Sequence, residues 1–138
     1  MTQRKGKKRR WASATVEMAI VTPLLLTMLF GIIEYGWVFS VKQALVTAAR
    51  EGARTAALPG STEADVEQRV ADFLSPMGMT TYTVTMTHAT ADNPVETVKL
   101  TIPYSDVTLI GEFFGSTDYD LGSTCSMRKE ALGGSDDE

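Results

Sequence analysis

The longest pattern in the chain is an uninterrupted apolar run near the N-terminus. Residues 18–33 carry no charged side chain and are apolar on every side of a helix. Counted from residue 13 to residue 33 at about 1.5 Å per residue, the helix spans about 31 Å, roughly one hydrocarbon layer of a membrane. Three aromatic residues follow where an outer aromatic belt would lie: Tyr35, Trp37 and Phe39. The pattern predicts a transmembrane helix over about 13–36.

A cleaved secretory signal is the main alternative for this run. The apolar region of such a signal usually covers about 7–15 residues and is followed by a site of small residues. The run in this chain is longer, and residues 32–36 (Ile-Ile-Glu-Tyr-Gly) offer no such site. We therefore expect the segment to stay in the protein as an anchor.

The helical pattern continues beyond the apolar run. No proline occurs between Tyr35 and Leu58, so a long helix is predicted over 13–58, ended by Pro59 and Gly60. Small residues at every fourth position allow a neighbouring helix or sheet to approach the backbone closely. These residues are Ala44, Ala48, Gly52 and Ala56. Either the chain's own head or a neighbouring subunit can cover this helix-packing face.

The remaining chain predicts a small head over residues 59–130. Thr62 and Asp65 fit a capping box, and apolar residues at helical spacing extend the helix to about residue 76. Three later segments then alternate apolar and polar residues with a period of two: 81–88, 97–104 and 119–128. This alternation is typical of antiparallel strands with one covered face.

The predicted fold class is therefore α+β. A long N-terminal transmembrane helix continues into a small head with one further helix and a three-stranded antiparallel sheet. The turn at residues 91–94 (Ala-Asp-Asn-Pro) joins the first two strands as a hairpin. We expect the sheet to pack against the small-residue face of the long helix.

The distribution of charge predicts the orientation of this helix across the membrane. Six of the first ten residues are basic and none is acidic, whereas the rest of the chain carries seven basic and 17 acidic residues. Lys and Arg gather on the cytoplasmic side of membrane helices. Residues 1–12 are thus expected to form a basic cytoplasmic leader of a single-pass protein of the cytoplasmic (inner) membrane. The head then lies outside the cytoplasm, and residues 131–138 form a disordered acidic tail.

The same context decides what the basic leader binds. A basic decapeptide can contact nucleic acid or an anionic surface. Because it directly precedes an apolar run, we expect its partner to be the lipid bilayer and not nucleic acid.

Few residues suggest chemistry. His88, the only histidine, is expected at the end of an inward strand face, and the only cysteine, Cys125, is expected as a small buried apolar residue. No spacing of ligands or nucleophile with base is visible, so we predict no enzyme, no metal and no cofactor. Loop 105–118 is unusually apolar, and it either folds back over the core or forms an exposed docking patch.

Glu17 is the informative charge. A carboxylate inside a membrane costs about 2.5–3.5 kcal/mol near the centre and less near an interface, and such groups usually mark function. Either Glu17 reaches to the cytoplasmic surface along the helix, or it pairs with a positive charge.

The surrounding residues resemble a known processing site. Basic residues, then Ala12, then Ser13-Ala14-Thr15-Val16-Glu17 resemble the prepilin-type cleavage context of type IV pilins and pseudopilins. In that context a dedicated membrane peptidase cuts five residues before the glutamate. The stretches Gln43-Ala44-Leu45 and Ala48-Ala49-Arg50-Glu51-Gly52-Ala53-Arg54 are similar to the TadE-like family of tight-adherence (Tad) pilus proteins. The resemblance extends over residues 9–57.

The resemblance implies a function in assembly. It points to a minor pseudopilin-like component of a Tad or type IVb-type pilus, or of a related secretion or adhesion apparatus, with a pilin-like fold. The implied partners are a prepilin peptidase, other pilin or pseudopilin subunits and the Tad inner-membrane platform. Cleavage between Ala12 and Ser13 would create a positively charged amine near Glu17, in the same chain or in a neighbouring subunit.

One departure from the family pattern keeps a second function open. Glycine usually precedes the cut, whereas this chain has Ala12 after the bulky Trp11. The alternative is a membrane-anchored extracytoplasmic binding or adhesion domain that is not cleaved and does not polymerise.

Overall fold

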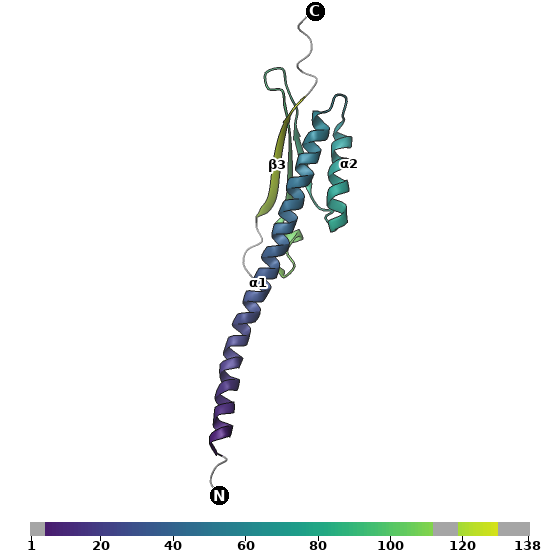
Figure 1. Ribbon diagram of the computed structural model, residues 1–138. Coiled ribbons are helices and arrows are strands. Elements are labelled where there is room, and N and C mark those ends of the chain that lie inside the picture. The colour runs from purple at the N-terminus through teal and green to yellow at the C-terminus, as the bar shows by residue number, and fades with distance from the viewer. Residues whose placement is uncertain (1–4, 112–118, 130–138) are drawn as a thin grey trace, which may run out of the picture. The chain divides into compact units, whose positions relative to one another are not determined.

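The computed structural model describes residues 5–111 and 119–129, with side chains from residue 14 onward. It confirms the α+β class, with a long apolar N-terminal helix, one further helix and a three-stranded antiparallel sheet (Figure 1). The predicted acidic tail and the aromatic residues Phe113 and Phe114 lie outside the described residues. In chain order the helices and strands are α1 (Lys5–Ala57), α2 (Glu63–Leu74), η1 (Ser75–Met77), β1 (Thr83–Thr87), β2 (Val95–Pro103), η2 (Tyr104–Asp106) and β3 (Asp120–Arg128).

Helix α1 starts earlier than the sequence pattern predicts. It runs from Lys5 instead of residue 13, because Lys and Arg are good helix formers and no proline separates the basic leader from the apolar run. Pro23 lies inside the helix and removes one backbone hydrogen-bond donor. On either side of it, threonine hydroxyls donate to backbone carbonyls, Thr22 to Met18 at 2.7 Å and Thr27 to Pro23 at 2.8 Å.

The chain divides into two compact units, Met1–Gly36 and Trp37–Glu138. Helix α1 contributes to both. The second unit therefore contains the last 21 residues of α1, Trp37–Ala57, together with the smaller elements. The sequence pattern divides the chain at residue 58, and the compact unit begins at Trp37 instead. In the rest of the text, this second unit is called the head.

Helix α2 starts as its sequence predicts. The hydroxyl of Thr62 accepts from the backbone N–H of Asp65, and the Asp65 carboxylate accepts from the backbone N–H of Thr62 at 2.8 Å. These two bonds complete the predicted capping box. The backbone N–H and the hydroxyl of Thr62 both donate to the Asp65 carboxylate, and together they lower its pKa. Val66, Val70 and Leu74 form the buried side of the helix.

The sheet has the order β1-β2-β3, and both pairings are antiparallel. Met86 of β1 and Cys125 of β3 both lie opposite Val98 of β2, so the three residues share one face. The predicted turn between β1 and β2 is present, closed by two backbone hydrogen bonds between Thr90 and Asn93. Central strand β2 carries the buried residues Val98, Leu100 and Ile102.

Three contacts define how β2 and α1 lie within the head. The Trp37 indole N–H donates to the carbonyl of Val107 at 2.7 Å, just beyond β2. The Lys42 ammonium donates to the carbonyl of Gly122 on β3, and Gly52 lies against Val98. Strand β2 thus runs antiparallel to α1. One end of the sheet lies beside Trp37, and the other end lies beside the C-terminus of α1.

Candidate membrane anchor and assembly site

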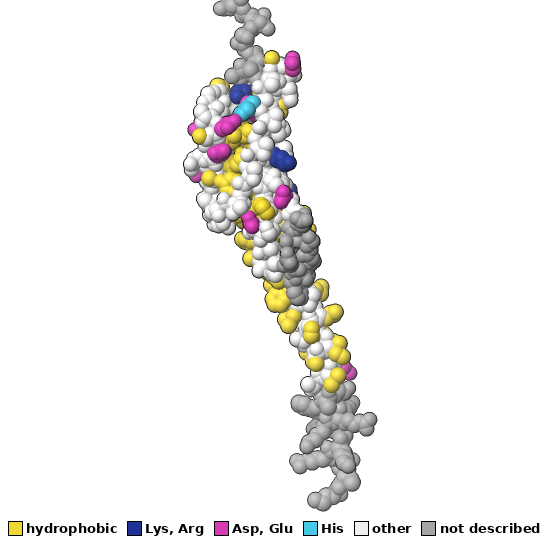
Figure 2. All heavy atoms as spheres, turned by 180° about the vertical axis from the view of Figure 1, so that it is seen from behind, with side chains coloured by type: hydrophobic (Ala, Val, Ile, Leu, Met, Phe, Trp, Pro, Cys, Tyr) yellow, Lys and Arg dark blue, Asp and Glu magenta, His cyan; other side chains and the backbone are white. Residues whose placement is uncertain are grey.

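The N-terminal unit presents an apolar surface. Every residue from Ala14 to Phe30 is exposed, including large side chains that a water-soluble helix would bury, such as Ile20 and Leu24. Figure 2 shows hydrophobic side chains along this part of α1, while the charged side chains in that view gather mainly on the head. The part of α1 over Ala14–Ala57 is long and apolar enough to cross a membrane. These observations support single-pass anchoring in a membrane.

The predicted processing residues lie in this anchor. Ala12 and Ser13 are in the helical backbone of α1, and the side chain of Glu17 is exposed one helical turn after Ser13. In lipid an exposed carboxylate is costly unless it reaches water or a cation. The structure therefore leaves Glu17 available to a partner outside its own head.

A second carboxylate in this unit is buried. Glu34 is only 4 % exposed, and it takes part in an interaction. Glu34 thus differs from Glu17, whose side chain is exposed on the same helix.

The small-residue face of α1 is covered by the head. Ala48, Gly52 and Ala56 are buried and Ala44 is half-buried. A Cβ atom on Gly52 would lie 3.0 Å from Val70 Cγ2, 3.4 Å from Val98 Cγ1 and 3.5 Å from Val66 Cγ1. Helix α2 and strand β2 thus occupy this face. Of the two partners that the sequence leaves open, a neighbouring subunit or the rest of the same chain, the structure has the same chain there.

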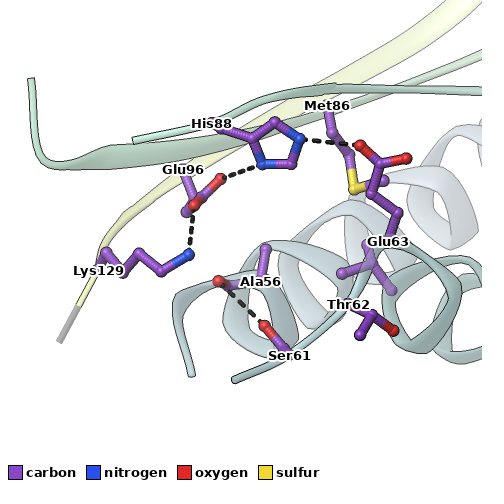
Figure 3. Close-up of a pocket in the computed structure, with 9 residues that line it drawn as sticks. Ala56, Ser61, Thr62, Glu63, Met86, His88, Glu96 and Lys129 are labelled. Atoms are coloured by element: carbon purple, nitrogen blue, oxygen red, sulfur yellow. Dashed lines mark hydrogen bonds and ion pairs between the residues drawn. The ribbon is translucent and has the colours of Figure 1, made fainter. Parts of the chain in front are cut away.

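A cluster of charged residues lies near Ala56, at the C-terminal end of α1 (Figure 3). His88 Nε2 lies 2.9 Å from Glu63 Oε1, and His88 Nδ1 lies 3.3 Å from Glu96 Oε2. The ammonium of Lys129 donates to Glu96 Oε1 at 2.8 Å. The cluster borders a hollow of about 20 Å³, room for about one water molecule.

The prediction for His88 is wrong. Strand β1 ends at Thr87, so the strand alternation does not reach His88, and its side chain is 58 % exposed. The buried group of the cluster is Glu96, whose side chain is 3 % exposed. A signal for it exists in the sequence, because Glu96 shares the period of two with Val98, Leu100 and Ile102. Sequence reasoning missed Glu96 because it began the strand one residue later.

Two pKa shifts follow from this geometry. The hydrogen bond to Glu63 raises the pKa of His88 above its usual value, and the negative charge of Glu96 acts in the same direction. Burial opposes ionisation of Glu96, but the Lys129 ammonium, the backbone N–H of Ala89 and His88 together lower its pKa. The cluster therefore joins α2, the β1–β2 hairpin and the end of β3 through charges.

We expect Glu63→Gln to lower the pKa of His88. Because the folded-state pKa of His88 is raised, its contribution to stability is complete below the unfolded value of about 6.5 and is lost as the pH rises through the folded value. The side chains of His88 and Glu63 are both exposed, so the contribution of their pair to the free energy of unfolding is at most about 1 kcal/mol. Since the chain has one histidine, NMR titration of the full chain in detergent reports this pKa directly. Glu67→Gln, on the same helix, is the control, and an unchanged pKa in Glu63→Gln would contradict the assignment.

The other chemistry-bearing residues give no metal site. Among residues 5–111 and 119–129, no group of three His, Cys, Asp or Glu side chains is arranged to hold a metal ion. Cys125 is a free thiol, half-buried against the core. In the apolar loop, Val107 is buried and packs on the core, whereas Leu109 is 58 % exposed. The described part of the loop, residues 105–111, is therefore partly folded back and partly exposed.

The comparisons with known proteins agree with the resemblance of the N-terminal helix. The family described as TadE-like protein matches residues 12–54. This match confirms the TadE-like resemblance over that stretch, which contains Ala12, Ser13 and Glu17 and all of the small-residue face except Ala56. Comparison with curated proteins and with solved structures found no match.

Proposed function

Since residues 12–54 match the TadE-like family, we propose that this chain is a minor pseudopilin-like component in the assembly of a Tad or type IVb-type pilus, or of a related secretion apparatus. The match supports a function associated with the Tad pilus. The observation that carries the finer proposal is the exposed apolar helix with one exposed carboxylate, Glu17, at the spacing of a prepilin-type site. In this proposal the chain is not an enzyme.

Processing creates the charge that Glu17 needs. The basic leader stays in the cytoplasm, and a prepilin peptidase cuts between Ala12 and Ser13. The α-amino group of Ser13 is then mostly protonated at neutral pH. Pairing with the Glu17 carboxylate, in the same chain or in a neighbouring subunit, offsets the cost of keeping both charges near lipid.

The two parts of α1 have different tasks in this mechanism. From Trp37 to Ala57 the helix is part of the head core, because its small-residue face is covered by α2 and β2. The stretch from Ala14 to Phe30 is exposed on all sides. Contacts of α1 with other pilin subunits and with the inner-membrane platform therefore fall to this stretch, and the outer surface of the head selects which neighbours fit.

Processing provides the test. We expect mature protein from its native host to begin at Ser13, and Ala12→Glu to block cutting while insertion stays normal, because the peptidase accepts only a small residue before the cut. Mass spectrometry of the N-terminal peptide measures both results. Ala64→Glu, at an exposed position of α2, is the control and should be cut normally. Mature protein that begins at Met1 or Thr2 would refute the proposal and favour the uncleaved, anchored binding domain.

A further inference from the structure

One end of the head carries apolar side chains that are exposed, next to others that pack on the core. Trp37 is tied to Val107 by the 2.7 Å hydrogen bond from its indole N–H, which holds residues 107–111 beside the start of the head. Tyr104 and Tyr119 stack at the same end of the sheet, with ring centroids 4.5 Å apart. The backbone N–H of Tyr104 also donates to the carbonyl of Tyr119 at 3.0 Å. Three chain segments thus meet at this end.

This end, called here the basal surface, consists of Tyr104, Leu109 and Tyr119. Leu109 is 58 % exposed and Tyr119 is 51 % exposed. Val107, two residues before Leu109, is buried in the core. The loop is therefore held in place by Val107, while Leu109 is exposed to the surroundings of the head. Exposed apolar groups that gather in one place usually mark a contact surface.

The position of Trp37 along α1 indicates what the basal surface contacts. Trp37 follows Ile33, the last residue of the apolar run, by four residues, or about 6 Å of helix. The polar layer on each side of the hydrocarbon is about 5–8 Å thick. A helix that crosses the membrane therefore places Trp37, and with it Val107, at the level of the lipid head groups. Trp and Tyr prefer this level because each combines an apolar ring with a polar group.

We propose that the basal surface rests in the head-group layer of the outer leaflet, as a second contact of the head with the membrane beside α1 itself. This proposal rests on the membrane anchoring that the proposed function requires. Lipid is the occupant that these observations favour, because Trp37, to which Val107 is hydrogen-bonded, follows the apolar run by only four residues of the same helix. The head is thereby held against the bilayer at two places and not by a single helix alone.

Charge shows which lipids are needed. Residues 104–111 and 119–120 contain no Lys or Arg, and they include the exposed acids Asp106 and Asp120. Attraction to anionic lipid requires basic residues near the surface. Contact of the basal surface is therefore expected with zwitterionic phosphatidylcholine alone, and it should not weaken at high salt.

Spin labelling of the full chain in phosphatidylcholine vesicles tests the proposal. In a Cys125→Ser background, single cysteines at Leu109→Cys and Tyr119→Cys carry nitroxide labels, and collision with oxygen and with a water-soluble nickel chelate reports their depth. Leu58→Cys is the matched control, an exposed leucine about 31 Å further along the chain of α1 than Trp37. Leu29→Cys marks the hydrocarbon layer.

The expected result is a severalfold lower collision rate with the nickel chelate at positions 109 and 119 than at position 58, unchanged by salt. If positions 109 and 119 match position 58 while position 29 is shielded, the basal contact is refuted and the anchor stands. If position 29 is also open to the chelate, the membrane anchor itself is refuted, and the proposed function fails with it.

Discussion

Glu17→Gln, expressed at the wild-type level, is expected to insert and to be cleaved normally but to stop pilus assembly. The substitution keeps the size of the side chain and removes its charge. The α-amino group of Ser13 is then left near lipid without a partner, and breaking a buried charge pair typically costs about 3–5 kcal/mol. A loss of this size would decrease the population of assembled subunits by more than a hundredfold, roughly, since about 1.4 kcal/mol corresponds to a factor of ten.

The measurement is cross-linking of the variant to the major pilin, with electron microscopy of surface pili. Met18→Gln is the matched control, because it introduces the same amide at the next position while Glu17 keeps its charge. Normal assembly in Glu17→Gln would rule out the charge pair and leave Glu17 as a residue that reaches to the cytoplasmic surface. If both variants fail, the amide itself and not the lost charge is responsible.

The second large effect is expected at Gly52. Gly52→Leu adds a side chain where even a Cβ atom would lie 3.0 Å from Val70 Cγ2, and overpacking of a core typically costs about 1–3 kcal/mol. We therefore expect a clear decrease in the free energy of unfolding of the head, measured by denaturant titration in detergent with circular dichroism.

Thr47→Leu provides the control for Gly52→Leu. Thr47 is exposed on the same helix, and its hydroxyl bonds only within its own turn, to the carbonyl of Gln43 at 3.0 Å. The same leucine should therefore change the stability of the head by much less at position 47. Equal decreases in the free energy of unfolding at positions 47 and 52 would show that the close contact of Gly52 with α2 and β2 does not restrict the size of the side chain there. Because Glu17→Gln changes assembly without changing the head, the two predictions separate the two tasks of α1.

Much of the fold is readable from local patterns. The capping box at Thr62, the turn at residues 91–94 and the alternation in β2 depend on neighbours along the chain, and the structure contains each of them. The small-residue spacing in α1 predicts a face open to close contact, and at Gly52 the structure has α2 and β2 close to that face. The spacing does not say which surface makes that contact, because glycine and alanine admit a neighbour without selecting it. Only the positions of Val66, Val70 and Val98 around Gly52 identify the head itself.

The charged cluster was beyond sequence reasoning for a related reason. His88, Glu96 and Lys129 are brought together by the pairing of β2 with its two neighbouring strands, and no spacing along the chain encodes that meeting. The alternation of apolar and polar residues assigns every second position to the inner face of a strand. His88 falls on such a position, so the pattern predicts that it points inward. In the structure the His88 ring is exposed and lies between the carboxylates of Glu63 and Glu96.

The position of Trp37 as the first residue of the head has a practical consequence for producing a water-soluble form. A shortened chain that starts at residue 59 would omit Val41, Leu45, Ala49 and Ala53, which are buried in the core. It would expose the inner faces of α2 and β2, and such a fragment would aggregate instead of folding. A shortened chain that starts at residue 37 keeps every buried residue of the head while leaving the apolar stretch behind. The boundary for secretion or crystallisation of the head thus lies inside a continuous helix and not at its end.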